Sequence, residues 1–188
     1  MITDKRLRIL MAAETLVSRF GVEGLSMHRV AKQAKLATGT IYLYFKDKDT
    51  LMSELHERNL RLFAEAFLAD VDFNASLKQQ HHQLWRNDFS YQQSNANVQR
   101  LWAHLETLPR NTRHKQLIQE LFEPVKLFFE KGVEQGCFKA LPSEMLYALA
   151  FGSLYEICRF SHLRDVNFSQ QDMDVALLAS WDAITVHP

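Results

Sequence analysis

The sequence predicts an all-α protein of about nine helices, and three observations support this fold class. Apolar residues recur at intervals of three and four along most of the 188 residues, which is the spacing of a helix that buries one side. Only six Gly and four Pro occur, too few for the many turns of an all-β sandwich or barrel. The composition, 47% hydrophobic and 23% charged, is that of an ordinary globular protein.

Three helices are expected in the first 45 residues. Asp4 can cap the first helix, and Gly21 is placed to end it. Ser26 can cap the second, and the connection at 35–37 leads into the third. The predicted ranges are about Thr3–Asp4 to Phe20, Met27–Ala34 and Thr38–Phe45.

A long fourth helix follows. Asp47 can cap it, and apolar residues from Leu51 to Ala66 mark one side. If it runs to about Ala69 it is on the order of 35 Å long, enough to connect two modules. Further helices are expected at about 77–88, Val98–Leu108, Arg113–Gln135, 143–163 and 169–186. Pro109 should end one of them, and Pro124 predicts a kink or a break.

The neutral total charge hides an asymmetry. Residues 1–48 contain nine Lys/Arg and four Asp/Glu, a net charge of +5, whereas residues 49–188 carry −5. Such a split suggests a polyanionic partner for the basic part, although a chance excess of five charges is the simpler reading. We therefore predict two domains, 1–48 and 49–188, of which the basic first one is a candidate for binding nucleic acid.

Two short helices joined by a three-residue turn, after a longer helix, predict a helix-turn-helix. Its second helix enters the major groove of DNA. With Ile41 and Phe45 facing inward, the outward positions carry Thr38, Gly39, Thr40, Tyr42 and Tyr44. Gly39 would let the backbone approach DNA, or alternatively would serve tight helix packing. The two tyrosines, close to Lys46 and Lys48, suit phosphate oxygens, with structural core tyrosines as the alternative.

The stretch from about Asp4 to Leu55 resembles the DNA-binding domain of the TetR family of bacterial transcriptional regulators. The matching elements are FGVEGLS, VAKQA and GTIYLYFKDKDTLM. The resemblance implies an all-helical dimer with an N-terminal DNA reader and a C-terminal effector-binding and dimerisation domain. Beyond residue 62 the resemblance is one of architecture only.

By position, the resemblance assigns roles to eight residues. Ser26 and His28 fall at the DNA-facing start of the second helix, and the groove and phosphate positions of the family are occupied by Thr38, Gly39, Thr40, Tyr42, Tyr44 and Lys48. Ala37 stands where the family usually has a capping Ser or Thr, so we expect Thr38 to substitute as the cap. Met27 and His28 replace commoner polar residues, so the base preference of the family does not carry over.

The last two predicted helices have the pattern of a helix-bundle dimer interface, with intramolecular core as the alternative. The candidate interface residues are Leu146, Leu149, Ser153, Ile157, Phe160, Leu177, Trp181 and Ile184.

An apolar effector pocket is the other expectation for the body of the chain, because 17 of the 21 aromatic residues follow residue 62 and few ionisable groups interrupt the apolar stripes. Each residue taken alone could equally be plain core. The candidate lining residues are Trp85, Phe89, Trp102, His104, Phe128, Tyr147, Phe151 and Tyr155.

Catalytic and metal-binding patterns are missing from the sequence. It has no HExxH, Walker loop, GxSxG or SxxK, and adjacent His81 and His82 would splay apart on a helix. We therefore expect no enzyme, no cofactor and no metal. Cys137 and Cys158 form no CxxC pair and fit a reducing interior, with a redox sensor as a remote alternative.

No membrane association is expected either. The charged start of the chain does not suit a signal peptide, and the charge-free stretch at 145–155 is too short to span a bilayer. A cytoplasmic location follows from these features.

The sequence thus predicts a homodimeric, ligand-responsive repressor that binds a palindromic double-stranded DNA operator and is released by a small apolar or aromatic effector. The alternative is a helical module that binds a small molecule and whose basic head contacts protein partners.

Overall fold

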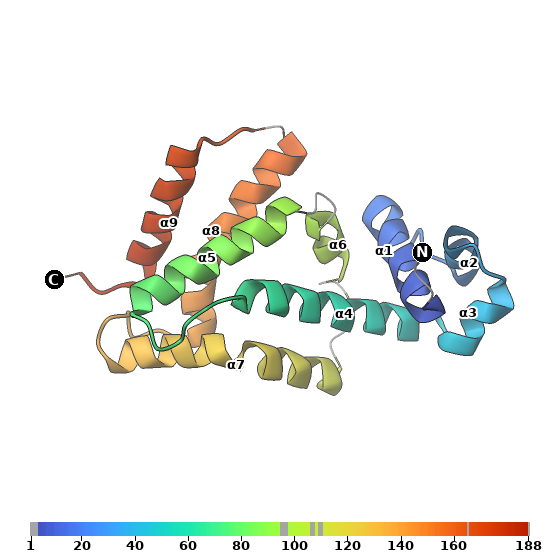
Figure 1. Cartoon of the computed structure of the whole chain (residues 1–188), viewed down its shortest axis with the longest axis horizontal. Helices are drawn as coiled ribbons and strands as arrows, with labels where there is room; N and C mark the ends of the chain where they lie inside the picture. Colours follow the sequence, from blue (N-terminus) through green and yellow to red (C-terminus); the bar gives the residue numbers. More distant parts are fainter. Residues whose placement is uncertain (1–3, 95–97, 106–107, 109–110, 165, 188) are drawn as a thin grey trace. The chain divides into compact units, whose positions relative to one another are not determined.

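The computed structural model confirms the all-α prediction (Figure 1). It describes residues 4–94, 98–105, 108, 111–164 and 166–187, and these residues form nine α-helices. The helices are α1 Lys5–Phe20, α2 Met27–Ala34, α3 Thr38–Tyr44, α4 Lys48–Leu68, α5 Leu77–Ser94, α6 Val98–Leu105, α7 Thr112–Glu134, α8 Ser143–Arg164 and α9 Gln170–Ile184.

The chain folds as two compact units. The first contains residues 1–62 and 97–115, and the second contains 63–96 and 116–188. Helix α6 therefore packs with the N-terminal helices, so packing divides the chain differently from the division at 48/49 that charge suggests. Helices α4 and α7 each contribute residues to both units.

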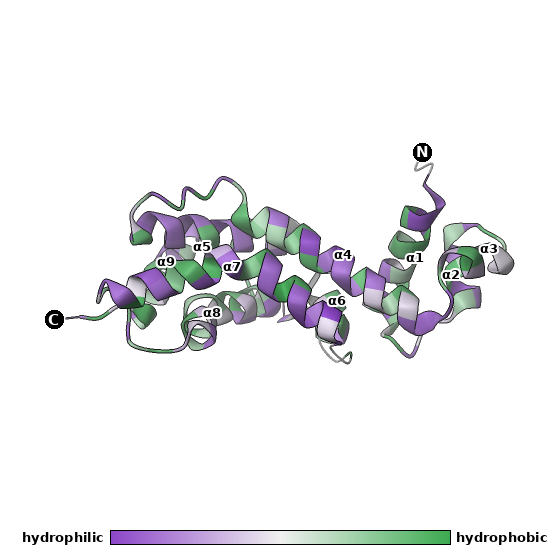
Figure 2. Cartoon of the chain, turned by 90° about the horizontal axis from the view of Figure 1, so that it is seen from below, coloured by the Kyte–Doolittle hydropathy of each residue, from purple (hydrophilic) through white to green (hydrophobic). Residues whose placement is uncertain are grey.

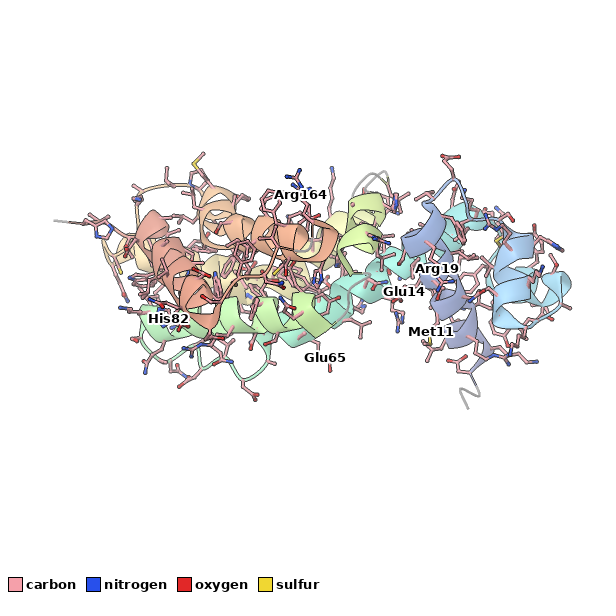
Figure 3. The ribbon with its side chains drawn as sticks, turned by 90° about the horizontal axis from the view of Figure 1, so that it is seen from above. Met11, Glu14, Arg19, Glu65, His82 and Arg164 are labelled. Carbon is pink, nitrogen blue, oxygen red and sulfur yellow. The ribbon has the colours of Figure 1, made fainter. Side chains whose placement is uncertain are left out.

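The first unit is built around one apolar cluster from α1–α4 and α6. Ile9, Ala13 and Val17 recur along one side of α1 and are fully buried. Leu101 and Leu105 of α6 belong to the same cluster, and α6 lies against α1. An ion pair on the surface adds little: Glu14, which Figure 3 labels on α1, accepts from Arg58 of α4 at 2.9 Å.

Helix ends follow local chemistry. Asp4 caps α1 by accepting from the backbone N–H of Arg6 at 2.8 Å, and Gly21 ends it with φ of 69°. Ser26 caps α2, and the carboxylate of Asp47 accepts from the N–H of Thr50 at 2.7 Å. All four predictions are confirmed.

One capping prediction is wrong. Ala37 occupies the N-cap position of α3, and no side chain caps this helix. The hydroxyl of Thr38 lies instead 3.4 Å from Nδ1 of His28 on α2. Thr38 is the first residue of α3, and its hydroxyl faces α2 instead of the first turn of its own helix. Helix α3 is thus held by packing and not by a cap.

The second unit is an aromatic core enclosed by α5, α7, α8 and α9, with the end of α4. Helix α8 packs against α9 and α5, and α5 also contacts α9. Figure 2 shows hydrophobic and hydrophilic residues mixed along these helices, as expected where each helix buries one side. The largest fully buried side chains of this unit are Phe67, Leu84, Phe128, Phe129, Phe138 and Phe151.

The end of the chain is tied back to the loop after α7. Phe138 and Thr185 form an isolated antiparallel bridge, in which Lys139 donates to the carbonyl of Ile184 and Val186 donates to that of Cys137, both at 2.9 Å. At the start of α9, Ser169 and Asp172 form the reciprocal capping box expected of a stable N-terminus.

Two prolines were expected to interrupt or end helices. Helix α7 continues through Pro124 without a break. Helix α6 is described from Val98 to Leu105, and the predicted end of this helix at Pro109 lies outside the described residues. Within the described residues, every helix is too short or too polar to cross a membrane.

Gly132 in α7 supplies a sharp test of the second core. A Cβ at this position would lie 2.0 Å from Cδ2 of the buried Phe138 ring. Gly132→Ala should therefore lower the free energy of unfolding by about 1–3 kcal/mol, although alanine favours helix. Urea unfolding would measure this change. Glu134→Ala, exposed near the same helix end, should stay within about 0.5 kcal/mol of the wild type. Equal stability of the Gly132 variant and the wild type would refute the packing described.

Candidate DNA-binding interface and effector domain

Two buried side chains fix how α3 is oriented in the first unit. Ile41 and Phe45, four residues apart, are both fully buried in the cluster that α1, α2 and α4 share. They occupy one side of a seven-residue helix, so the opposite side is left to solvent. The guanidinium of Arg6 covers the ring of Phe45, 4.9 Å from its centroid, and pairs with Glu54. The outward side of α3 is thus set by the core beneath it.

Gly39 lies open on this outward side. A Cβ added there would meet no atom within 4 Å, so packing inside the protomer gives no reason for a glycine. The tight-packing alternative is therefore excluded. Thr38 and Thr40 are half-buried beside it, and Tyr42 is 53% exposed one turn further on.

Tyr44 and Lys48 differ from the simple expectation of free phosphate ligands. Tyr44 is half-buried and packs against the core of the first unit. The ammonium of Lys48 donates to the carbonyl oxygen of Val22 at 2.7 Å, which ties the start of α4 to the turn after α1. Two of its three N–H groups remain for another acceptor. Both residues thus have structural partners besides any role toward DNA.

The start of α2 lies next to α3. His28 is exposed, and its ring approaches Thr38. Ser26 acts as the cap, which uses its side-chain oxygen as an acceptor. Arg29 braces this end, because its guanidinium lies 4.6 Å from the centroid of the Phe20 ring and also donates to the carbonyl of Gly24. The helix-turn-helix therefore presents one continuous surface from two helices.

Sequence reasoning missed Leu43. This side chain is 84% exposed on α3, the highest value among the exposed large hydrophobic residues of the described chain. An apolar group on the outer side of a groove-reading helix can contact the C5-methyl group of thymine. The helical spacing could have indicated this position. Leu43 lies two residues from both Ile41 and Phe45, which places it on the opposite side of the helix.

The eight predicted pocket residues do not come together in one unit. Trp102 and His104 belong to the first unit, where Trp102 packs against the core and His104 lies beside Gly21. The other six belong to the second. Trp85, Phe128 and Phe151 are core residues there, whereas Phe89 and Tyr147 are half-buried against the same core, and Tyr155 is half-buried on α8. We therefore leave Trp102 and His104 out of any effector site.

The predicted dimer residues separate in the same way. Leu146, Leu177 and Ile184 are at most 5% exposed in the core of the second unit, so these side chains are not on its surface. Ile157, Phe160 and Trp181 are half-buried, and Leu149 and Ser153 are exposed. The structure adds three exposed apolar residues on these two helices that the sequence pattern did not select: Met145, Val175 and Leu178.

Asp88 is a buried carboxyl group on α5 that sequence reasoning also missed. It is 4% exposed, and Nε2 of Gln92 donates to its Oδ1 at 3.0 Å. Burial disfavours the charged carboxylate and raises the pKa of Asp88 to about 7, while the bond from Gln92 lowers it by less. Among the described residues, no Lys or Arg forms an ion pair with it.

Two further kinds of site were considered, a reactive cysteine and a metal site. Burial raises the pKa of the Cys158 thiol to about 12, and the nearby Asp88 adds to this effect, so the reactive thiolate is scarce. In the described part of the chain, no three His, Cys, Asp or Glu side chains are grouped to hold a metal ion.

Helix α3 is short, is held by the core beneath it and presents an open glycine and polar groups outward beside α2. This arrangement is that of a helix-turn-helix DNA-binding protein. Comparison with known proteins agrees. Residues 9–55 match the family described as bacterial regulatory proteins, tetR family, and residues 76–185 match the tetracyclin repressor-like C-terminal domain. The chain belongs to the TetR family of transcriptional regulators.

Three relatives place the chain within this family. A TetR-family protein structure from Vibrio parahaemolyticus is 35% identical with a TM-score of 0.86, and the match covers 98% of this chain and all of that one. An HTH-type transcriptional regulator of Haemophilus influenzae is 27% identical over 97% of this chain and 96% of its own length. The fatty acid metabolism regulator protein of Bacillus subtilis is 26% identical over 81% of this chain and 80% of its own length.

The raised pKa of Asp88 makes a prediction about stability. Between its ordinary value of 3.8 and about 7, only the folded state holds the proton, so this group makes the protein less stable as pH rises through that window. Asp88→Asn should remove the effect. The gain in free energy of unfolding should be small at pH 4 and reach about 4 kcal/mol at pH 8.

Urea unfolding at both pH values measures this gain. Asp182→Asn, exposed on α9, changes the net charge equally and should show no such gain. The same gain at pH 4 as at pH 8 would mean that the Asp88 carboxyl is not held in its neutral form by burial.

Proposed function

We propose that the protein is a homodimeric repressor that binds a palindromic operator through α3 and is released by a small effector with an apolar or aromatic body. The observation that carries the proposal is the outward side of α3. Thr38, Gly39 and Thr40 are small groups at the start of the helix, where base edges are read, and Tyr42 lies one turn further along. We propose that Ser26, His28, Tyr44 and Lys48 support contacts with the phosphates around it.

Dimerisation follows from the size of the reading surface. A single seven-residue helix buries little area on DNA, so useful specificity requires two half-sites. A two-fold dimer places two such helices in successive major grooves about 34–36 Å apart. We propose an interface through the exposed apolar residues of α8 and α9, namely Met145, Leu149, Val175 and Leu178, with Ser153 and Phe160 adjoining.

The effector is proposed to bind in the second unit, among its aromatic side chains. The name of the Bacillus subtilis relative, a fatty acid metabolism regulator, supports an effector with an apolar part. An effector shifts the equilibrium between conformations only by its difference in affinity for them. Release therefore requires that it favour a conformation in which the two α3 helices no longer match the operator. The protein would act on the chromosome in the cytoplasm, without catalysis.

A second candidate is a small-molecule-binding module whose head contacts proteins. It predicts weak DNA binding with no sequence preference at physiological salt. The open Gly39 favours the first candidate, because a protein partner gives no particular reason for bare backbone at that position.

Gly39→Ala separates DNA contact from folding. Because a Cβ meets open space within the protomer, alanine should raise the free energy of unfolding by up to about 1 kcal/mol. The same methyl group should lower affinity for DNA that the wild type selects from a random pool by at least tenfold, since it occupies the space where backbone and duplex meet. Fluorescence anisotropy would measure the affinity.

Gln119→Ala, exposed on α7, serves as the control and should change neither quantity by much. Tyr42→Phe should weaken binding to all sequences alike, as loss of a phosphate contact does. Full affinity in both the Gly39 and the Tyr42 variants would remove α3 from the DNA interface.

Leu178→Glu tests the dimer. The side chain is 48% exposed, so the substitution should leave the protomer folded while it places a charge in the proposed interface. Sedimentation at micromolar concentration should give a dimer for the wild type and a monomer for the variant. Gln171→Glu, exposed near the start of the same helix, should remain dimeric. A wild-type monomer that still protects both halves of a palindrome would contradict this interface.

A further inference from the structure

Four polar side chains form a row on the buried side of α5. His81, Trp85, Asp88 and Gln92 recur at intervals of four, three and four, and none is more than 6% exposed. Such spacing places all four on one side of the helix. This side packs against α8 and α9. Polar side chains on the side of a helix that packs into an aromatic core are unusual, because burial of a polar group costs free energy unless the group is paired.

Two members of this α5 row lack partners. Nδ1 of His81 and Nε1 of Trp85 are buried without a hydrogen bond in the structure. The hydroxyl of Ser180 on α9 lies 3.3 Å from Nε2 of His81 and donates to the carbonyl of Leu177 at 2.8 Å. Its single proton is thus used, so Nε2 of His81 is the donor and Nδ1 is a bare acceptor.

The neutral state of His81 agrees with this assignment. Burial lowers the pKa of His81 to about 3, and the neighbouring His82 adds to the effect. His82, which Figure 3 labels on α5, also has a buried ring nitrogen without a partner. The row therefore offers an acceptor on His81 and the indole N–H of Trp85, and no Lys or Arg among the described residues forms an ion pair with Asp88.

Aromatic rings surround the row. The ring of His81 lies 5.8 Å from that of Phe151 and 5.4 Å from that of Trp181, measured between centroids, and Trp85 stacks on Phe89 at 5.8 Å. A buried carboxyl group on a helix side that also carries aromatic rings is a combination that suits an organic cation, through charge pairing and cation–π attraction. An anionic head group would instead face Asp88 with no positive charge to balance it.

We propose that the buried side of α5 is an effector site for a hydrophobic organic ammonium ion, with the carboxylate of Asp88 as its counter-ion and the unpaired acceptor Nδ1 of His81 on the same side of the helix. The ion would lie between α5 and α8, where Phe151 and Cys158 oppose the row. This inference rests on the proposed function, because it names the chemical class of that regulator's effector.

Three eight-carbon probes with different head groups test the class. The full-length protein is titrated at pH 7 with n-octylamine, which is an ammonium ion there, with 1-octanol and with octanoate. Intrinsic Trp fluorescence reports binding, since Trp85 and Trp181 lie at the row. Octylammonium should bind at least tenfold more tightly than octanol, and octanoate should bind more weakly than octanol.

Asp88→Asn removes the charge and keeps the size and the partner Gln92. Its affinity for octylammonium should fall at least tenfold, to that of octanol, while its affinity for octanol stays within twofold. Circular dichroism establishes that the variant is folded. Asp182→Asn makes the same change of charge on the exposed side of α9 and should bind all three probes as the wild type does.

Several outcomes overturn the inference. Octanol or octanoate binding as tightly as octylammonium would do so, as would an unchanged ammonium affinity in Asp88→Asn. An absence of saturable octylammonium binding would mean that the row holds only structural water.

The proposed function is tested separately, by release of operator DNA. Asp88-dependent amine binding without release supports the site and contradicts its regulatory role. Release by octanoate, with no Asp88-dependent preference for the amine, supports the regulator and contradicts the ammonium site.

Discussion

The functional surface depends on two buried side chains, Ile41 and Phe45. A seven-residue helix without a side-chain cap is not stable alone in water, so α3 exists because these residues are packed into the core of the first unit. The same packing decides which residues face outward. Arg6 adds to this arrangement from α1, because it covers the ring of Phe45 and pairs with Glu54.

Local signals made much of the fold predictable from the sequence. The range of α2 and the caps at Asp4, Ser26, Asp47 and Ser169 depend on neighbouring residues, which the sequence displays directly. The position of α6 depends on contacts made about ninety residues away along the chain, and helical periodicity carries no information about them. The sequence therefore could not show that Trp102 packs against the core of the first unit.

The candidate sites were predictable to different degrees. The outward residues of α3 follow from the two inward ones, and the same spacing places Leu43, which the sequence analysis did not name, on the exposed side. On α8 and α9 the apolar residues surround more than one side, so the pattern could not separate Leu146, which is buried in the protomer, from Leu149, which is exposed. Asp88 was missed because a single acid in a polar-looking segment gives no sign of burial until α8 is placed against it.

The central claim is that the outward side of α3 carries the sequence preference of this regulator. The most direct measurement selects bound DNA from a random pool with the wild type, with Thr40→Ala and with Leu43→Ala. We expect a two-fold symmetric motif for the wild type, altered at matching positions in both halves by each variant, with thymine preference reduced for Leu43→Ala. An identical motif from all three proteins, or no enriched motif at all, would contradict it.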